Sequence, residues 1–493
     1  MPPKDPKTVP MREQPANERI HNFNEVPYGY SEEEAVAEAT RCFNCKADRA
    51  LCIPGCPVTI DIPRFIRQIT ERDFAGAYRT ILENNSLPAV CGRVCPQEEQ
   101  CQKKCIAGIK GEPISIGRLE RFVADWAAAN QTKPRGQTIQ IPLNPPFSKG
   151  EALSDLPLAR GGRRDFPVLS QKVAVIGSGP SGLTCAADLR RLGYEVTIFE
   201  ALHEAGGVLL YGIPEFRLPK SIIKREVDLI QEQGVELYLN ALVGKLFSLE
   251  DLMQDQGYSA VFVGVGAGLP SMPPMPGDHL AGVYSANEYL TRINMMQAYK
   301  FPEMPTPVNV GEIVGVMGGG NVAMDAARTS LRMGARESHI IYRRSADELP
   351  ARAEEVHHAR EEGIIFDLLV NPLELIGNEQ HQLKAIKCIR MELGEPDDSG
   401  RRRPVVQPGS EFTMPLNTFI YAIGQSPNPI LSSNTPALKT KKWGYIETNP
   451  ETLETSIPGV YAGGDVIGGS TVIQAMGDGK RAAKSIHEYL KKL

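Results

Sequence analysis

The sequence has no long hydrophobic run. None of its 493 residues belongs to a stretch long and apolar enough to cross a membrane, and residues 1–23 lack the apolar core of a signal peptide. A basic excess is also missing, because the formal net charge is -5 at pH 7. This charge argues against a nucleic-acid partner. We therefore expect a cytoplasmic protein that has no membrane span and binds no nucleic acid.

Cysteine is scarce outside one region. Of the 10 cysteines, eight lie between residues 42 and 105, and only Cys185 and Cys388 lie elsewhere. In a reducing compartment such a cluster binds metal more often than it forms disulfides. The composition is otherwise that of an ordinary globular protein, with 42% hydrophobic and 23% charged residues, and the length suffices for about three domains. We therefore expect a metal-binding N-terminal region and further domains after it.

A dinucleotide-binding fingerprint follows a predicted buried strand at residues 173–176. Gly177 makes the tight turn, Gly179 allows backbone amides to approach a pyrophosphate, and Gly182 allows the helix to pack closely on the strand. The next predicted strand ends at Glu200, whose carboxylate can accept a ribose hydroxyl. The residues predicted to contact this first dinucleotide are Gly177, Ser178, Gly179, Pro180, Ser181, Gly182, Glu200 and Ala201.

A second unit of the same kind begins at residue 313, which makes the pattern an internal repeat. Its strand, turn and helix recur, but the following strand ends in Arg343-Arg344 where the first unit has Glu200. Arginine pairs with a 2′-phosphate, whereas an acid accepts a ribose hydroxyl, so we predict FAD in the first unit and NADPH in the second. The residues predicted to contact NADPH are Gly318, Gly319, Gly320, Asn321, Val322, Arg343, Arg344 and Arg352.

Glycine-rich loops and strand ends elsewhere are predicted to complete the two sites. An Asp beside glycines, as at residues 463–465, can hydrogen-bond a ribityl hydroxyl, and the helix that follows directs amides toward the flavin ring. Loop 206–219 can equally be a simple crossover connection. The residues included in the predicted sites are Gly206, Gly207, Val208, Arg217, Gly266, Ala422, Ile423, Gly424, Gly464, Asp465, Ser470, Thr471 and Val472.

The eight clustered cysteines form two sets, Cys42-x2-Cys45-x6-Cys52-x3-Cys56-Pro and Cys91-x3-Cys95-Pro-x4-Cys101-x3-Cys105. Thiolates in sets of four suit zinc or an iron–sulfur cluster. The endings in which proline follows cysteine resemble the ferredoxin pattern, which favours two interlocked [4Fe–4S] clusters over two structural zinc sites. Helices are predicted from Ser31 to Thr40 and within residues 60–82, residues 113–120 are predicted to lead into another helix that ends near residue 129, and residues 131–170 are predicted to be a linker.

As a set, these motifs resemble the family of the small (β) subunit of NADPH-dependent glutamate synthase. Relatives of that family include the NADPH-binding subunit of NADH-dependent ferredoxin:NADP oxidoreductase and the N-terminal half of dihydropyrimidine dehydrogenase. The resemblance implies an α/β protein in which a helical double-[4Fe–4S] domain precedes two Rossmann-like domains, the FAD domain being interrupted by the NADPH domain. The predicted boundaries are 1–130 for the iron–sulfur domain, 131–170 for the linker, 171–290 and 421–493 for the FAD domain, and 291–420 for the NADPH domain.

The resemblance also implies which residues hold the clusters. One cluster would use Cys42, Cys45, Cys52 and Cys105, and the other Cys56, Cys95, Cys101 and Glu120. Cys91 would then be a neighbour, although eight thiolates shared equally by two clusters is the alternative. The gap from Cys45 to Cys52 and the linker are longer than is usual in this family.

The family further implies a reaction and a partner. NADPH would pass a hydride to the flavin with no side chain acting as acid or base, and the clusters would carry single electrons outward. Because the chain shows no amidotransferase nucleophile motif, we expect the acceptor to be a glutamate synthase large subunit, another electron-accepting subunit or ferredoxin. The alternative from another class is a zinc-stapled nucleotide-binding scaffold without redox activity.

Overall fold

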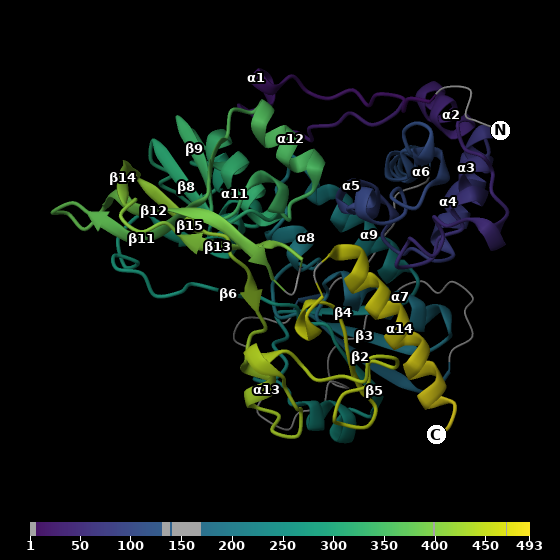
Figure 1. Cartoon of the computed structure of the whole chain (residues 1–493). Coiled ribbons are helices and arrows are strands. Elements are labelled where there is room, and N and C mark those ends of the chain that lie inside the picture. The colour runs from purple at the N-terminus through teal and green to yellow at the C-terminus, as the bar shows by residue number, and fades with distance from the viewer. Residues whose placement is uncertain (1–5, 131–138, 141–168, 398–399, 470) are drawn as a thin grey trace.

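The computed structural model describes residues 6–130, 139–140, 169–397, 400–469 and 471–493. A helical N-terminal region lies beside two separate parallel sheets, and an antiparallel sheet extends from the second of them (Figure 1). Most of the predicted linker 131–170 and the predicted contact Ser470 lie outside the described residues. No helix in the described part of the chain is long and apolar enough to span a membrane.

The N-terminal region is built from short helices. Ser31 caps the second helix in a capping box with Glu34, which confirms the predicted helix start. The predicted helical stretch 60–82 is divided into two helices, because Asp73 accepts the Gly76 N–H at 2.8 Å and starts a new one. The helices are α1 (Ala16–Arg19), α2 (Glu32–Thr40), α3 (Ile62–Thr70), α4 (Phe74–Leu82), α5 (Pro88–Val94) and α6 (Ile116–Asn130), with 3-10 turns η1 (Ala47–Arg49), η2 (Gln97–Glu99) and η3 (Ile106–Ile109).

The first sheet is entirely parallel, with the strand order β1-β4-β3-β2-β5-β17. Helix α14 packs along α7 beside this sheet, and α9 lies between α7 and the N-terminal region (Figure 1). The strands are β1 (Ile139–Gln140), β2 (Lys172–Ile176), β3 (Glu195–Phe199), β4 (Glu236–Leu239), β5 (Tyr258–Val263) and β17 (Val460–Ala462), and the helices are α7 (Pro180–Arg191), α8 (Val208–Tyr211), α9 (Lys220–Glu232) and α14 (Val472–Leu490), with the π-helical turn η5 (Asp251–Asp255).

The second sheet is also parallel, with the order β10-β9-β8-β15-β7, and the antiparallel strands β11 to β14 are inserted between β10 and β15. Its strands are β7 (Val283–Ser285), β8 (Ile313–Met317), β9 (Glu337–Tyr342), β10 (Ile365–Leu368) and β15 (Thr418–Tyr421). The insertion contains β11 (Val370–Gly377), β12 (Leu383–Pro396), β13 (Arg402–Val406) and β14 (Phe412–Pro415), and the helices of this unit are α10 (Ala286–Asn294), α11 (Asn321–Arg332) and α12 (Ala353–Glu361).

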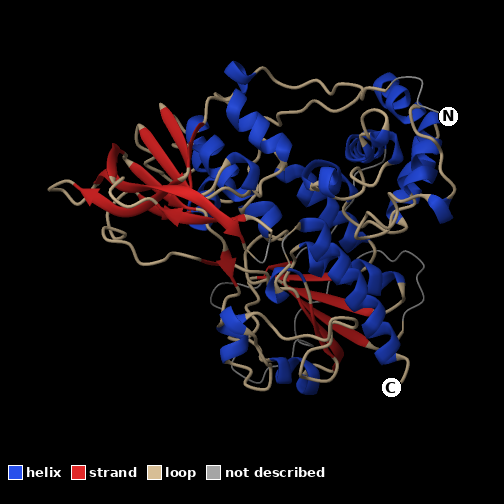
Figure 2. Ribbon diagram, in the orientation of Figure 1, coloured by secondary structure: helices blue, strands red, loops and turns tan. Residues whose placement is uncertain are grey.

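The chain crosses between the two sheets twice, through β6 (Leu269–Pro270) and β16 (Gln425–Ser426), which pair antiparallel with each other. Figure 2 shows this short connection between the two groups of strands. The predicted boundary at residue 290 is therefore too late, because β7 already pairs in parallel with β15 in the second sheet. Residues 427–493 return to the first sheet, where they contribute α13 (Ile430–Ser433), the 3-10 turn η9 (Gly464–Ile467), β17 and α14.

Hydrophobic burial attaches the N-terminal region to the first unit. One continuous core runs from buried side chains of the helical region, such as Phe65 and Leu119, into Leu183 on α7 and Met476 on α14. The two faces of the second sheet have separate cores. Since burial of apolar area is the main source of cohesion in proteins, the helical region and the first unit form one packed body.

Candidate functional site: two dinucleotide units and two cysteine groups

The first glycine turn lies where the carboxyl ends of β2 and β5 meet. Gly177 has φ +97°, and a Cβ added to it would be 2.5 Å from the Gly264 carbonyl oxygen. A Cβ on Gly182 would be 1.9 Å from the Gly177 carbonyl oxygen, so α7 and β2 touch through backbone. The N-terminus of α7, capped by Gly179, therefore points its unpaired amides at the crevice beyond the sheet.

Glu200 is fixed at the end of β3 by the same turn. Its Oε2 accepts the Ser178 N–H at 2.8 Å and the Ser178 hydroxyl at 2.5 Å, while its Oε1 accepts the Leu202 N–H at 2.9 Å. The carboxylate is 6% exposed. These donors orient the Glu200 carboxylate beside the glycine turn, which is the arrangement that a ribose hydroxyl requires.

Loop 206–219 closes over this turn. The Gly206 N–H donates to the Ser178 hydroxyl at 3.0 Å, and a Cβ on Gly207 would lie 3.0 Å from the Gly179 Cα. Tyr211, on α8 just beyond, has its pKa raised to about 12 by burial and by the charges of Asp465 and Glu200. Sequence reasoning missed Tyr211, whose only signal is its place in this loop.

The segment after β17 reaches the same crevice. The Gly464 N–H donates to Asp478 on α14 at 2.9 Å, and a Cβ on Gly464 would be 2.9 Å from the Ser181 hydroxyl oxygen. Burial, followed by the neighbouring Asp478 charge, raises the pKa of Asp465 to about 6. Thr471 caps α14 by accepting the Gln474 N–H at 3.3 Å. The predicted residues 464 and 465 therefore lie beside the first turn, residues 471 and 472 begin the helix that follows, and Asp478 is an addition that sequence reasoning missed.

The second glycine turn repeats the first. Gly318 has φ +145°, and a Cβ added to it would be 2.2 Å from the Ala422 carbonyl oxygen at the end of β15. Gly320 caps α11, which begins at Asn321. An added Cβ on Gly320 would meet nothing within 4 Å, and the same holds for Gly266 and Gly424. Both units thus combine a close backbone approach with open space at the turn, which is the cradle that a dinucleotide needs.

The three arginines predicted for the 2′-phosphate have different surroundings. Arg343 is exposed, and its side chain makes no hydrogen bond or ion pair within the described residues. Arg344 is buried and pairs with Asp397 at 2.6 Å. Arg352 donates to Glu98 at 3.2 Å and to the Arg93 carbonyl at 3.1 Å. Only Arg343 therefore keeps the free guanidinium that the prediction requires, because Arg344 and Arg352 are neutralised in ion pairs.

Arg217, which was predicted to contact the first dinucleotide, is held in ion pairs with acidic side chains of the second unit. Its guanidinium donates to both oxygens of Asp325 on α11, at 2.8 and 2.7 Å, and pairs with Glu355 on α12 at 2.8 Å. Burial opposes the charge, but these carboxylates raise the pKa of Arg217 above its usual value. A buried guanidinium needs acidic partners, and Arg217 has them in the second unit, so its contact with a cofactor stays a prediction.

Four cysteines form a group near the surface, which we call the outer group: Cys42, Cys45, Cys52 and Cys105, all half-buried. Burial raises the pKa of Cys42 to about 11, and the charges of Cys105 and Cys45 add to the shift. Burial likewise raises the pKa of Cys52 to about 12, with contributions from the other three thiols. These mutual effects mean that the four sulfurs face one space, and metal binding would remove their protons.

The other four cysteines are buried and form the inner group: Cys56, Cys91, Cys95 and Cys101. Burial raises the pKa of Cys56 to about 11, with contributions from Glu120 and Cys91. The hydrogen bond that the Cys95 thiol donates to Cys91, followed by burial, raises the pKa of Cys95, and burial raises that of Cys101. Consecutive cysteines of one motif, such as Cys52 and Cys56, thus belong to different groups, as the interlocked arrangement predicts.

Glu120 and Cys91 both contact Asn85 in the inner group. The Asn85 amide donates to Glu120 Oε1 at 2.7 Å, and the Cys91 thiol donates to Asn85 Oδ1 at 3.7 Å. Burial raises the pKa of Glu120 to about 8, the Asn85 hydrogen bond lowers it, and the Glu226 charge raises it. Either side chain can therefore face a cluster in this group, and the choice of Glu120 stays a prediction.

The spacing of the sulfurs is too wide for single zinc ions. A tetrahedral zinc with Zn–S bonds of about 2.3 Å holds its sulfurs about 3.8 Å apart. Among the described residues, no three cysteine sulfurs lie within 4.8 Å of one another. A larger four-iron cluster fits such a spacing better.

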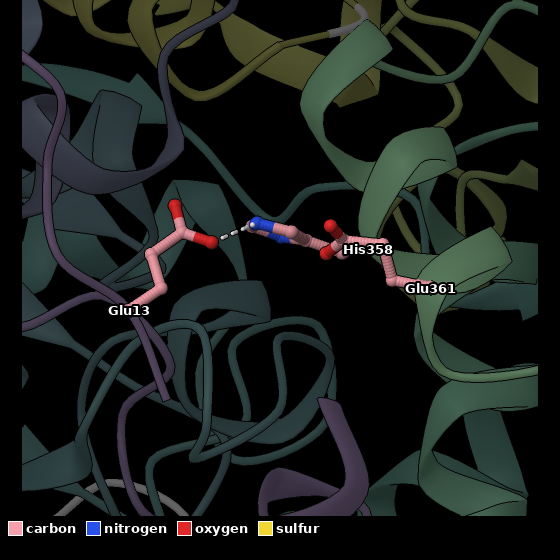
Figure 3. A group of neighbouring side chains, drawn as sticks. All are labelled: Glu13, His358 and Glu361. Atoms are coloured by element: carbon pink, nitrogen blue, oxygen red, sulfur yellow. Dashed lines mark hydrogen bonds and ion pairs between the residues drawn. The ribbon is translucent and has the colours of Figure 1, made fainter. Parts of the chain in front are cut away.

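A group with the spacing of a metal site lies elsewhere. Figure 3 shows Glu13 reaching from the N-terminal arm to His358, with Glu361 beside it on α12, and their ligand atoms lie within 4.8 Å of one another. Arg19 donates to Glu361 at 2.9 Å and to Glu362 at 2.7 Å, and it lies 3.8 Å from Glu13. Because the Arg19 guanidinium pairs with these carboxylates, we interpret the group as ion pairs that join residues 13–19 to α12.

Comparison with known proteins gives matches over almost the whole chain. Residues 19–132 match the family described as dihydropyrimidine dehydrogenase domain II, 4Fe-4S cluster, and residues 170–482 match pyridine nucleotide-disulphide oxidoreductase. The fold also resembles that of FprA from Mycobacterium tuberculosis, solved in complex with NADPH, with a TM-score of 0.55 and 20% identity over 66% of this chain and 85% of that chain.

Curated relatives are more similar in sequence. The chain is 41% identical over 450 residues to NADP(+)-dependent formate dehydrogenase subunit beta of Moorella thermoacetica, covering 90% of this chain and 60% of that protein. It is 34% identical over 499 residues to the small chain of glutamate synthase [NADPH] of Escherichia coli, covering 99% of this chain and 96% of that protein. It is 36% identical over 468 residues to NADPH-Fe(3+) oxidoreductase subunit beta of Geobacter sulfurreducens, covering 90% of this chain and 64% of that protein.

These matches confirm the α/β fold class and the cofactors predicted from the sequence, FAD, NADPH and [4Fe–4S] clusters. The zinc-stapled scaffold is therefore wrong. Bound FAD and NADPH would be held by the two glycine turns, and the clusters by the inner and outer groups.

Proposed function

Since the chain belongs to the pyridine nucleotide-disulphide oxidoreductase family, and is an NADPH-dependent flavin and iron–sulfur oxidoreductase, we propose that it is the NADPH-oxidising subunit of a larger enzyme. Its relatives are small or beta subunits of enzymes with further subunits. In this proposal the flavin accepts a hydride from NADPH and releases single electrons to the clusters, which conduct them to a partner.

The contact between α14 and the inner group is the observation that carries this proposal. Helix α14 reaches the first turn through Asp478, which accepts the N–H of Gly464 beside Ser181. Met476 lies on the same helix, roughly 6 Å of rise beyond Val472. The Met476 sulfur is 3.4 Å from the Cys91 sulfur, and a Cβ on Gly477 would be 3.2 Å from the Pro57 carbonyl oxygen. A single helix therefore links the predicted flavin site with the inner group, which supports electron transfer between them.

The chain's own residues would orient the cofactors. The amides at the N-terminus of α7 and the Glu200 carboxylate hold the first dinucleotide, and Arg343 selects the second by pairing with a 2′-phosphate. No side chain at either turn needs to act as acid or base, so the predicted set of catalytic residues stays empty. The protein supplies position and charge, which is the usual contribution to cofactor chemistry.

An anaerobic titration with NADPH tests the proposal. The purified protein should show flavin bands with a broad iron–sulfur shoulder, and NADPH should bleach both. Bleaching of neither, with both chromophores present, would contradict the proposal.

Arg343→Ala should raise the KM for NADPH about tenfold or more while changing the KM for NADH little, because one charge-assisted phosphate pair is lost. Arg336→Ala, which removes another exposed arginine, serves as the control. An equal effect on both nucleotides would refute the phosphate role.

Two partners are favoured by different observations. The match to the glutamate synthase small chain spans 96% of that protein, which favours a glutamate synthase large subunit. The identity of 41% to the formate dehydrogenase subunit favours another electron-accepting subunit, although the chain spans only 60% of that protein. Formation of glutamate from glutamine and 2-oxoglutarate with a co-purifying subunit supports the first partner. NADPH-linked turnover of ferredoxin without glutamate formation supports the second.

A further inference from the structure

The outer group is the part of the cysteine region that meets solvent. Its four cysteines are half-buried, whereas all four cysteines of the inner group are buried. The segments that border it are residues 43–54, which include η1, and residues 99–110, which include η3. They are adjacent in space, because a Cβ on Gly55 would be 3.1 Å from Lys104 Cγ and the charge of Cys105 contributes to the raised pKa of Cys52.

Large apolar side chains are exposed on these two segments. Leu51 is 55% exposed, Ile106 40% and Ile109 78%. Leu51 directly precedes Cys52, and Ile106 directly follows Cys105, so the apolar surface adjoins two of the four sulfurs. Exposed apolar side chains that gather at one place indicate an interaction surface. Because Ile109 is exposed, its side chain is not part of this chain's own core. Its apolar surface would be removed from water only by contact with a partner.

The same two segments are positively charged on a chain that is negative as a whole. They contain five lysine and arginine residues against two acids, while the chain has a net charge of -5. Lys103 pairs with Glu99 at 2.6 Å, and Arg49 lies 3.9 Å from Asp48. The exposed ammonium groups of Lys46, Lys104 and Lys110 make no ion pair or hydrogen bond within the described residues. The outer group thus lies beneath a local excess of free positive charge.

We propose that this surface docks an acidic redox protein that takes electrons from the cluster of the outer group. We call it the outer rim and define it by Lys46, Arg49, Leu51, Lys104, Ile106, Ile109 and Lys110. The proposal rests on the proposed function and specifies its partner. Carboxylates around the partner's own redox centre would pair with the free lysines and steer its approach, and the three apolar side chains would exclude water from the contact.

Charge decides between this occupant and a second copy of the chain. Two copies meeting through the same rim would place the free lysines of each against those of the other, and like charges in contact disfavour association. An acidic partner has the opposite sign. Electrons would then cross a short gap, because the outer cysteines lie directly under the contact.

The test uses the full chain with its flavin and clusters and an acidic ferredoxin as the probe. Lys46→Glu/Lys104→Glu reverses two charges of the outer rim, and Lys439→Glu/Lys441→Glu makes the same net change at two exposed lysines of the first unit. The second-order rate of NADPH-driven ferredoxin reduction should fall about tenfold or more at low salt for the rim variant only. The difference should shrink at high salt, where charges are screened.

Three outcomes separate the proposal from its rivals. Equal rates of ferredoxin reduction for the rim and control variants would overturn the proposal. The proposal would also be overturned if the wild-type chain formed a dimer and the rim substitutions dissociated that dimer without changing the rate of ferredoxin reduction. If NADPH fails to bleach the flavin and clusters of the wild-type protein without ferredoxin, the proposed function fails instead. Bleaching should be the same in all variants.

The apolar part of the outer rim can be tested without changing charge. Ile109→Ser should weaken ferredoxin binding several-fold at high salt, where electrostatic steering no longer dominates. Val406→Ser, at a position that is 47% exposed on β13, is the matched control. Unchanged ferredoxin binding by the Ile109→Ser variant would show that the apolar side chains of the outer rim do not contribute to docking.

Discussion

The inner and outer groups have similar cysteine motifs but opposite surroundings. The inner group is buried and packs through Cys91 against Met476 of α14, within a core shared with the first sheet. The outer group is half-buried and is bordered by exposed apolar and basic side chains. Packing, and not cysteine spacing, therefore distinguishes the two groups. In the proposed electron path the inner group is the end fixed to the first unit by apolar burial, and the outer group is the end that would face a partner.

The largest effect should come from removing one ligand of each group in turn. Cys95→Ser should alter or remove the inner cluster, abolish NADPH-driven ferredoxin reduction and leave the outer cluster oxidised, because electrons then stop at the flavin. Cys52→Ser should also abolish ferredoxin reduction but leave the inner cluster reducible by NADPH. Rapid-mixing absorbance and paramagnetic resonance would distinguish the two variants. Cys388→Ala, far along the chain in β12, is the control.

Flavin content and circular dichroism should be retained in both variants, so that loss of folding is separated from loss of a ligand. If the Cys95→Ser protein still reduces ferredoxin, electrons leave the flavin by a route that avoids the inner group. The contrast between the two groups would then have no functional meaning.

A second prediction concerns the fourth ligand of the inner group. Glu120→Ala should alter or remove the paramagnetic signal of the inner cluster, whereas Cys91→Ala should preserve it, because we assign the ligand role to Glu120. Both side chains contact Asn85, so loss of either disturbs the same neighbour. The reverse pattern would return Cys91 to the ligand set and give two all-thiolate clusters.

A third prediction uses the difference in exposure directly. On incubation with an oxidant and a chelator, the outer cluster should be lost several-fold faster than the inner cluster, because solvent reaches half-buried sulfurs more readily than buried ones. The decay of the two paramagnetic signals after re-reduction measures both rates in one sample. Loss of the two clusters at one common rate would mean that the cysteine region opens as a unit.

Much of this arrangement could be predicted from the sequence because its signals are local. The turn at Gly177 and the turn at Gly318 each combine strand, glycine and helix within a short segment, and both have the predicted backbone approach. The division of the cysteines into two groups followed from the family resemblance. The helix start at Ser31 depends on residues three positions apart. The glycine turns and the helix start are determined by neighbours in the chain, whereas the cysteine groups join residues from two distant motifs.

The ion pairs of Arg217 and Arg352 could not be predicted from the sequence, because the partners of these arginines are distant in the chain. Arg217 pairs with Asp325, 108 residues away, and Arg352 donates to Glu98, 254 residues away. An arginine has the same local sequence whether it meets a phosphate or a carboxylate from another unit. The boundary at residue 290 was wrong for the same reason, since β7 is assigned to the second sheet only by its pairing with β15.

The smallest expected effect concerns stability. Met476 is fully buried against the inner group, so Met476→Ala should lower the free energy of unfolding by about 2–5 kcal/mol. Ile109→Ala on the outer rim should change it by no more than about 0.5 kcal/mol, because the side chain is exposed. Thermal unfolding of the two variants measures the difference. Similar unfolding temperatures would mean that the contact with α14 does not stabilise the inner group.

The most direct measurement is the order in which the two clusters are reduced after wild-type protein is mixed with NADPH and frozen at successive times. Our account predicts that the flavin bands bleach first, the paramagnetic signal of the inner cluster rises next, and the signal of the outer cluster rises last. The Cys52→Ser variant identifies which signal belongs to the inner cluster. Reduction of the outer cluster ahead of the inner one, or a reduced flavin beside two clusters that stay oxidised, would contradict the account.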